Sequence, residues 1–243
     1  MTETWRLITT WGAEPAFNMG LDETLLRSAH APPTLRFYSW QPDTLSLGYF
    51  QRFADVRGTD RAGAVVRRLT GGGAIHHVNE LTFSISVPRN HRLYRGPIAE
   101  SYIRVHGAIA RALQELGVDP KLRGDDALLS ERPETGMCFH KSSPLDLVWD
   151  RRKGVGSAQR RGKTRILHHG SIKLGPSPLE EEVATVASTG NTVACEAFAP
   201  ILAGALAQGL DVTLEAGGPT EAEREQATDF GARYIDPAFL KRR

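Results

Sequence analysis

The sequence predicts an α+β fold in which a mixed or antiparallel sheet is flanked by helices. Helical and extended patterns alternate irregularly through the first half, and from about residue 179 the pattern is mainly helical. Because no regular strand–helix repeat occurs, a doubly wound parallel sheet is not expected. The 243 residues, of which 40% are hydrophobic, suffice for one sizeable core, and no linker divides them. We therefore expect a single domain over residues 1–243.

The first elements are a helix and several short strands. Apolar residues recur every four positions at Phe17, Leu21 and Leu25, which predicts an amphipathic helix after Pro15. Short runs rich in β-branched and aromatic residues follow, and turn-forming residues separate them. They predict strands of one sheet at residues 34–40, 45–48, 64–69 and 81–87.

The second half begins with the clearest helix. Apolar residues keep spacings of three and four over residues 98–116, and Gly117 is expected to end that helix. Residues 121–136 are polar and irregular, which predicts a mobile surface loop. Three strands are then expected at residues 145–149, 155–158 and 166–174, followed by helical patterns at residues 180–182, 195–210 and 221–234.

Charge and cysteine content exclude several classes of protein. Thirty Lys and Arg against 28 Asp and Glu give a net charge of +2, so no nucleic-acid or membrane partner is indicated. Two cysteines argue against a disulfide-rich secreted fold. No apolar stretch approaches the roughly 18 residues that span a bilayer, and the N-terminus lacks a signal-peptide pattern. We expect a cytoplasmic protein, and its size is compatible with a monomer.

A glycine-rich loop lies between two predicted strands. Residues 67–77 contain two arginines, three consecutive glycines and two histidines. Such a loop exposes backbone N–H groups to an anion or lets a ligand approach the main chain. It lacks the spacing of a P-loop, and it precedes a strand where a dinucleotide fingerprint would open a helix. A flexible hairpin loop is the alternative interpretation.

A second cluster is strongly basic. Residues 151–165 contain seven Lys and Arg, which predicts a patch that attracts an acidic protein, a phosphate or a carboxylate. A solvated hairpin is the alternative. The small residues of this segment favour the first interpretation, because they leave room for a ligand beside the backbone. They are Gly154, Gly156, Ser157 and Ala158.

Cys138 is the candidate nucleophile. A neighbouring cation favours a thiolate by lowering the thiol pKa from about 8.5, and Lys153 is the candidate for that cation. The alternative is an inert buried cysteine, an interpretation that suits Cys195 at the start of a predicted helix better.

Histidines occur in two adjacent pairs, at residues 76–77 and 168–169. Adjacent side chains on a strand point to opposite faces, so each pair supplies at most one ligand to a metal, and no His or Cys motif with metal-binding spacing occurs. No metal site is expected. The nucleophile motif of serine hydrolases is also missing from the sequence.

These fragments together resemble the lipoate-protein ligase A and octanoyltransferase family, over roughly residues 5–175. Residues 18–23 resemble the first helix of the family, and residues 35–48 with Gln51 resemble its strand–turn–strand signature. Residues 67–76 look like its lipoyl-binding loop. Residues 153–159 and 168–172 look like the segment with the family's lysine and the strand beside the acyl pocket.

The resemblance implies a catalytic domain of the class II biotinyl and lipoyl ligase type, and it leaves two chemistries open. Ligases activate free lipoate with ATP and Mg²⁺, whereas transferases take an octanoyl group from acyl carrier protein through a cysteine thioester. Cys138 with Lys153, together with Glu80-Leu-Thr-Phe-Ser84, resembles the cysteine-dependent octanoyltransferases of the ligase-like branch. The end at residue 243 leaves no room for the extra C-terminal domain of typical single-chain ligases.

Two positions instead look ligase-like. Gly73 stands where many of these transferases carry arginine, and His168 stands where many carry glutamine. The alternatives are therefore a ligase completed by a separate accessory protein, a lipoyl-domain octanoyl amidotransferase, or a relative that only binds acyl chains or lipoyl domains.

The expected function is octanoyl transfer from octanoyl-acyl carrier protein to a lipoyl-domain lysine, on glycine cleavage H protein or on the E2 subunit of a 2-oxoacid dehydrogenase. No cofactor is expected, unless the ligase alternative brings in ATP and Mg²⁺. Cys138 and Lys153 are the expected catalytic residues. The substrate-binding residues that the resemblance implies are Arg67, Thr70, Gly71, Gly72, Gly73, His76, Gly156, Ser157, Ala158, His169 and Gly170.

Overall fold

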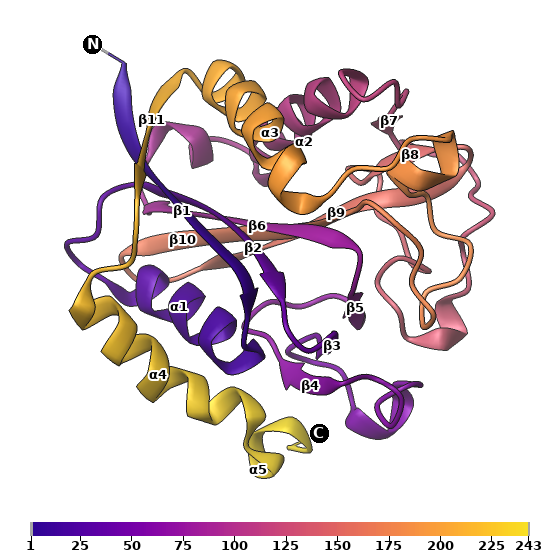
Figure 1. The fold of residues 1–243 in the computed structure, drawn as a ribbon, viewed down its shortest axis with the longest axis horizontal. Coiled ribbons are helices and arrows are strands. Elements are labelled where there is room, and N and C mark those ends of the chain that lie inside the picture. Colours follow the sequence, from indigo (N-terminus) through magenta and orange to yellow (C-terminus); the bar gives the residue numbers. More distant parts are fainter. Residues whose placement is uncertain (1, 243) are drawn as a thin grey trace.

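The computed structural model describes residues 2–242 and has a three-layer α+β architecture, as predicted. Figure 1 shows α2 and α3 on one side of a large sheet, and α1 and α4 on the other. The helices are α1 (Pro15–Arg27), α2 (Ile98–Gln114), α3 (Cys195–Leu210), α4 (Glu221–Ile235) and α5 (Pro237–Leu240), with short 3₁₀ turns η1 (Phe53–Asp55), η2 (Arg92–Tyr94), η3 (Pro133–Thr135) and η4 (Val186–Thr189).

The large sheet is mixed and has eight strands in the order β11-β1-β2-β6-β10-β9-β8-β7. Pairs β11·β1 and β1·β2 are parallel, and the remaining pairs are antiparallel. Its strands are β1 (Glu3–Ala13), β2 (Thr34–Trp40), β6 (Glu80–Pro88), β7 (Lys121–Leu122), β8 (Leu147–Trp149), β9 (Arg152–Arg161), β10 (Arg165–Lys173) and β11 (Val212–Gly217).

A second, small sheet corrects the expectation of one sheet. It has the order β4-β3-β5 and contains β3 (Thr44–Leu47), β4 (Ala64–Arg67) and β5 (Ile75–His77). The turn at Pro42-Asp43 does not make a hairpin of β2 and β3, because β2 pairs with β1 and β6 while β3 pairs with β4 and β5. The chain thereby leaves the large sheet and forms a separate wall opposite it.

The two faces of the large sheet differ in polarity, which positions the site. On β6, Phe83 and Ile85 face α2 and α3 in the main apolar core. Ser84 lies between them on the strand and faces α1, where its hydroxyl donates to the Asp22 carboxylate at 2.8 Å. This follows from the alternation of side chains along a strand. The α1 face therefore carries buried polar groups that are hydrogen-bonded to one another.

The C-terminal part contains α3, α4 and α5, and also a strand that the helical pattern did not reveal. β11 joins the edge of the large sheet, parallel to β1. The helix expected at residues 180–182 was wrong, because Glu180 is buried 2.6 Å from Lys173 in an irregular segment. No helix in residues 2–242 is long and apolar enough to cross a membrane.

The polar segment 121–136 is partly regular. It contains β7 and η3, and the Leu129 N–H donates to the Arg151 carbonyl at 2.7 Å. The helix expected over residues 98–116 is confirmed as α2, with Gly117 in the left-handed region at φ +75° just beyond its end.

Candidate active site

The centre of the site is a cysteine beside a buried lysine. The Lys153 ammonium nitrogen lies 3.6 Å from Cys138 Sγ and 2.9 Å from a carboxylate oxygen of Asp146. It also donates to the carbonyls of Cys138 at 3.0 Å and Lys141 at 3.3 Å. The sequence-predicted pair is thus brought together from the loop after η3 and from the start of β9.

The surroundings keep Lys153 charged. Burial on its own would lower the pKa of the ammonium, but the neighbouring Cys138 side chain and Asp146 carboxylate outweigh burial and raise its pKa above the ordinary value. A buried cation at 3.6 Å attracts a thiolate strongly, and the thiolate is the nucleophilic form of cysteine.

Cys138 is fixed against the glycine-rich loop. Its N–H donates to the Ala74 carbonyl at 2.7 Å, and the Ala74 N–H donates to the Gly136 carbonyl at 2.9 Å. A Cβ on Gly73 would lie 2.6 Å from the Cys138 nitrogen, closer than real contacts allow. Glycine at position 73 therefore lets the cysteine segment lie against the loop.

Arg68 organises the same loop from inside. Its guanidinium donates to the carbonyls of Ser46, Gly71 and Gly73 at 2.7 to 2.9 Å. Gly72, at φ +95°, adopts the left-handed conformation that glycine tolerates, so the chain curls around the guanidinium. Hydrogen bonds from Arg68 to the Gly71 and Gly73 carbonyls hold the loop in a defined conformation. The flexible hairpin interpretation does not describe it.

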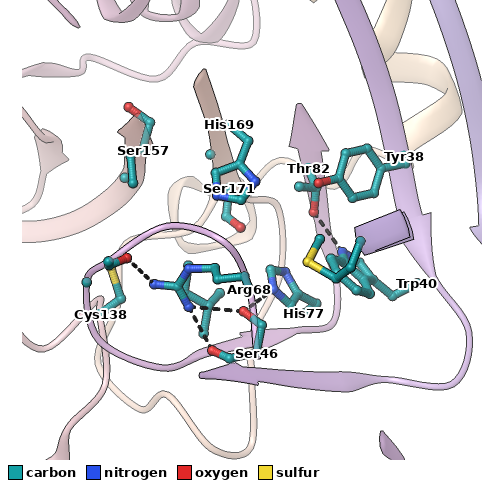
Figure 2. A pocket seen from close by; sticks show the side chains of 17 residues that line it. Tyr38, Trp40, Ser46, Arg68, His77, Thr82, Cys138, Ser157, His169 and Ser171 are labelled. Atoms are coloured by element: carbon teal, nitrogen blue, oxygen red, sulfur yellow. Dashed lines mark hydrogen bonds between the residues drawn. The ribbon is translucent and has the colours of Figure 1, made fainter. Parts of the chain in front are cut away.

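A narrow inner cavity extends from Cys138 between the two sheets. Figure 2 shows Cys138 and Ser157 at one end and Tyr38 and Trp40 at the other. The lining is Met19, Tyr38, Trp40, Ser46, Arg68, Gly71, Gly72, Ile75, His77, Thr82, Cys138, Gly156, Ser157, Ala158, His169, Gly170 and Ser171.

An outer cleft meets the inner cavity at Cys138. Its walls include Gln51, Pro133, Lys141, Asp146 and Lys153. Three residues border both spaces, namely Gly72, Cys138 and Ser157. The sulfur therefore lies where a chain in the cavity and a group entering through the cleft would meet.

Polar groups in the cavity wall are paired with one another. His77 stacks on Trp40 with ring centroids 4.2 Å apart, and its nitrogens contact Glu80 at 2.5 Å and Ser46 at 2.7 Å. Burial lowers the pKa of His77 to about 4, so the ring is neutral at pH 7. Burial on its own would raise the pKa of Glu80. Lys173 and His77 outweigh burial and hold that pKa well below its usual range. With its polar groups satisfied internally, the wall can accommodate an apolar ligand.

Comparison with known proteins shows the family of this chain. Residues 14–194 match the family model of the lipoyl protein ligase A/B catalytic domain. The chain belongs to this family.

Its relatives include transferases. Octanoyltransferase LipM of Kyrpidia tusciae is 35% identical over 96% of this chain and 97% of that protein. Octanoyltransferase LipM of Moorella thermoacetica is 42% identical, over 71% of this chain and 66% of that protein's length. Octanoyltransferase LipM of Bacillus subtilis is 39% identical over 71% of this chain.

Solved structures confirm the fold of the lipoyl protein ligase A/B domain. A lipoate-protein ligase A bound with ATP superposes with a TM-score of 0.77 at 22% identity, covering 99% of both chains. A bipartite lipoate protein ligase from Thermoplasma acidophilum, described with its E2 lipoyl domain, gives a TM-score of 0.77 at 20% identity over 99% of this chain and 97% of that one. At these identities the likeness concerns the fold alone.

The domain brings most of the sequence-predicted residues to one place. Cys138 and seven of the predicted binding residues line the inner cavity: Gly71, Gly72, Gly156, Ser157, Ala158, His169 and Gly170. Gly73 lines the outer cleft with Lys153. Thr70 supports the wall, because its hydroxyl lies 2.6 Å from His169 Nε2, whose ring also contacts Asp22 at 3.2 Å.

Arg67 and His76 lie elsewhere. Arg67 donates to the carbonyls of Gly48 at 3.0 Å and Gln51 at 2.7 Å, on the far side of the loop from Arg68. His76 is held between Asp43 at 2.8 Å and Ser177 at 2.9 Å. Neither lines the inner cavity. Alternation of side chains turns the neighbours Arg68 and His77 toward the cavity in their place.

Sequence reasoning missed Arg68, His77 and Asp146. The strand period carried a signal for the first two, since one residue of each adjacent pair had to face the site. Nothing in the sequence singled out Asp146, because only folding brings the loop before β8 against the Lys153 ammonium.

The histidine pairs split between the two faces, as expected. His77 and His169 border the inner cavity, whereas His168 lies among aromatic rings on the α2 side, 4.8 Å from Tyr102 between ring centroids. Across residues 2–242, no three His, Cys, Asp or Glu side chains are arranged to hold a metal ion.

Cys195 differs from Cys138 in its surroundings. It begins α3, and its thiol donates to the Glu80 carbonyl at 2.9 Å. Burial raises the pKa of Cys195 to about 11, which keeps it protonated at neutral pH. Its contacts are those of a structural cysteine.

The basic segment 151–165 is not one patch, which corrects that expectation. Lys153 is buried at the active site, and Arg165 is buried and donates to the Ser86 hydroxyl and the Ala31 carbonyl. Arg151 lies at one end of β9, and Arg160 at the other. At about 3.3 Å per residue, an extended strand of ten residues separates its two ends by roughly 30 Å. Basic residues that are close in the sequence of this segment therefore lie on separate surfaces.

Proposed function

We propose that this protein transfers an octanoyl group from the thioester of an acyl carrier protein to the ε-amine of a lipoyl-domain lysine. The observation that carries the proposal is the Cys138–Lys153 pair, 3.6 Å apart, placed where the inner cavity meets the outer cleft. The relatives named octanoyltransferase support the acyl group and the reaction class.

The first step forms an acyl-enzyme. The Cys138 thiolate adds to the carbonyl carbon of the carrier thioester, a tetrahedral intermediate forms, and the carbon–sulfur bond to the carrier breaks. The electron pair goes to the carrier sulfur, which leaves as a thiolate and takes a proton from water. Lys153 remains an ammonium throughout, because its protons are engaged by Asp146 and by carbonyls.

The second step releases the product. The neutral amine of the acceptor lysine attacks the acyl-enzyme carbonyl, the bond to Cys138 Sγ breaks, and the sulfur returns as a thiolate beside Lys153. The attacking nitrogen loses one proton to water and becomes the amide. Because the donor thioester is already activated, this reaction needs neither ATP nor another cofactor.

The inner cavity suits the acyl chain. Its glycines at positions 71, 72, 156 and 170 add no side chains to the cavity wall. Tyr38 and Trp40 offer apolar surface at the far end from Cys138, as Figure 2 shows, and Met19 also lines the cavity. Burying an octanoyl chain there contributes about 0.8 kcal/mol for each CH₂ group.

The protein partners reach the site in turn. A covalent intermediate lets the acyl carrier protein leave before the lipoyl domain binds, so one outer cleft can serve both. The acceptors we propose are glycine cleavage H protein and the E2 lipoyl domain. A related lipoate ligase is described with an E2 lipoyl domain, which supports the acceptor class.

Transfer without ATP tests the proposal. The purified protein is mixed with octanoyl-acyl carrier protein and an unmodified lipoyl domain, and acceptor mass is followed. We expect octanoylation in the absence of ATP that is lost in Cys138→Ala. Modification only with octanoate and ATP would establish the ligase alternative. Modification only from an octanoylated lipoyl domain would establish the amidotransferase, and binding without turnover would contradict any catalytic role.

A further inference from the structure

Two buried histidines and a serine form a hydrogen-bonded chain beside the reacting sulfur. Ser157 Oγ lies 2.7 Å from His106 Nε2 and 2.9 Å from His168 Nε2. His106 belongs to α2, His168 to β10 and Ser157 to β9. Figure 2 shows the Ser157 hydroxyl pointing away from Cys138, although Ser157 borders both the inner cavity and the outer cleft.

The direction of each hydrogen bond follows from the partners. His106 Nδ1 contacts the Leu145 carbonyl, which can only accept, so Nδ1 carries the proton and Nε2 accepts from the Ser157 hydroxyl. The Ser157 oxygen must then accept from His168 Nε2–H. Burial lowers the pKa of both histidines, so both rings are neutral at pH 7. The hydroxyl is therefore committed to the α2 side.

The main chain of Ser157 faces the other way. β9 pairs with β8 only as far as Val155, so the edge of β9 beyond that residue is not covered by β8. The Gln159 backbone interacts with Tyr102 on this edge, away from β10. Residues two apart on a strand point their N–H groups the same way, so the Ser157 N–H also points from this edge, where the cleft holds Cys138 and Lys153.

Building on the proposed acyl transfer, we infer that the Ser157 main-chain N–H stabilises the oxyanion of the tetrahedral intermediate on Cys138, and that His106 and His168 are positioning residues that hold it. When the Cys138 thiolate bonds to the carbonyl carbon, the π electrons move to oxygen. The N–H donates to that oxyanion without losing its proton, and the electrons return when the leaving group departs. Fixed donors of this kind require no reorganisation during the reaction.

His106 has a second link that strengthens its positioning role. The Leu145 carbonyl that it holds belongs to the residue before Asp146, and Asp146 holds the Lys153 ammonium. One buried ring therefore ties together the segment that fixes the cation and the strand that carries the oxyanion donor. Neither histidine lines the inner cavity.

Three changes test the inference, with two measurements on each. Replacing the Ser157 peptide N–H by an ester oxygen removes the donor and keeps the side chain, and we expect acyl-transfer kcat to fall by about 10²–10³. His106→Asn keeps a donor near Leu145 but cannot reach Ser157, and we expect a fall of at least about tenfold. His168→Gln keeps a donor for Ser157 and should stay within a few-fold of wild type. The second measurement is the pH profile of Cys138 alkylation, which should be unchanged in all three.

The controls separate this inference from the proposed function. His91→Asn alters another buried histidine, bonded to Glu3 at 2.7 Å far from the site, and should leave transfer unchanged. If wild type forms no acyl-enzyme, the proposed function fails. If wild type is active and the ester substitution leaves kcat unchanged, the function stands and the inference is overturned. A shifted alkylation profile in His106→Asn would also overturn it, because the ring would then act through the thiolate.

Discussion

Replacing Lys153 by methionine tests how far the buried ammonium stabilises the thiolate. The nitrogen lies 3.6 Å from Cys138 Sγ, and the Lys153 side chain is 3% exposed. At that distance Coulomb's law gives about 1 kcal/mol in bulk water and about 5 kcal/mol at an effective dielectric constant near 20. Because 1.36 kcal/mol corresponds to a factor of ten in an equilibrium constant, the rate of Cys138 alkylation at pH 7 should fall by at least about fivefold. The unpaired Asp146 carboxylate acts in the same direction.

The assay is the rate of iodoacetamide labelling at pH 7, followed on the Cys138 peptide by mass spectrometry. Cys195 provides an internal reference, since burial raises its pKa to about 11 and keeps it mainly protonated at pH 7. Lys163→Met removes an exposed lysine and is the matched control, and Lys153→Arg keeps the cation if the methionine variant does not fold. An unchanged rate of Cys138 labelling in folded Lys153→Met would refute the electrostatic reasoning.

Three further predictions follow from other contacts. Asp146→Asn frees the ammonium from its carboxylate, so Cys138 alkylation at pH 7 should become faster, and a slower reaction would contradict the charge argument. Gly170→Ala places a Cβ 2.5 Å from a backbone oxygen and should lower the free energy of unfolding by about 1–3 kcal/mol, whereas Gly204→Ala, in open space on α3, should stabilise by up to about 1 kcal/mol; urea denaturation distinguishes them. His77, with a pKa of about 4, takes up a proton more readily when unfolded, so the free energy of unfolding should fall as pH drops from about 6.5 to 4, by up to about 1.4 kcal/mol per unit. Urea denaturation at pH 7 and pH 5 should show a smaller fall in His77→Gln, and an equal fall would contradict this.

Elements whose patterns are set by burial on one face were predictable. Helix α2 has a single apolar stripe, and it begins and ends close to the predicted positions. Strand β11 was missed because its six residues lie between two helices, and its pairing with β1 depends on residues some 200 positions earlier. Local patterns carry no information on such distant pairing.

The same division applies to the site. Cys138 and the glycine-rich loop were recognisable because rare residue types and close backbone approach leave a mark on the sequence. Asp146 and His106 were not recognisable, since their importance comes from the atoms that they contact after folding. The prediction of one basic patch was wrong for a related reason. An extended strand places charges that are close in the sequence at its two ends.

The central claim is that Cys138 carries the octanoyl group, and intact-protein mass spectrometry measures this most directly. The protein is mixed with octanoyl-acyl carrier protein without ATP or acceptor, and its mass is recorded before and after hydroxylamine, which cleaves thioesters. The account predicts one octanoyl adduct per chain, sensitive to hydroxylamine, absent in Cys138→Ala and retained in Cys195→Ala. An adduct that persists in Cys138→Ala, or no adduct on an enzyme that still modifies the lipoyl domain, would contradict it.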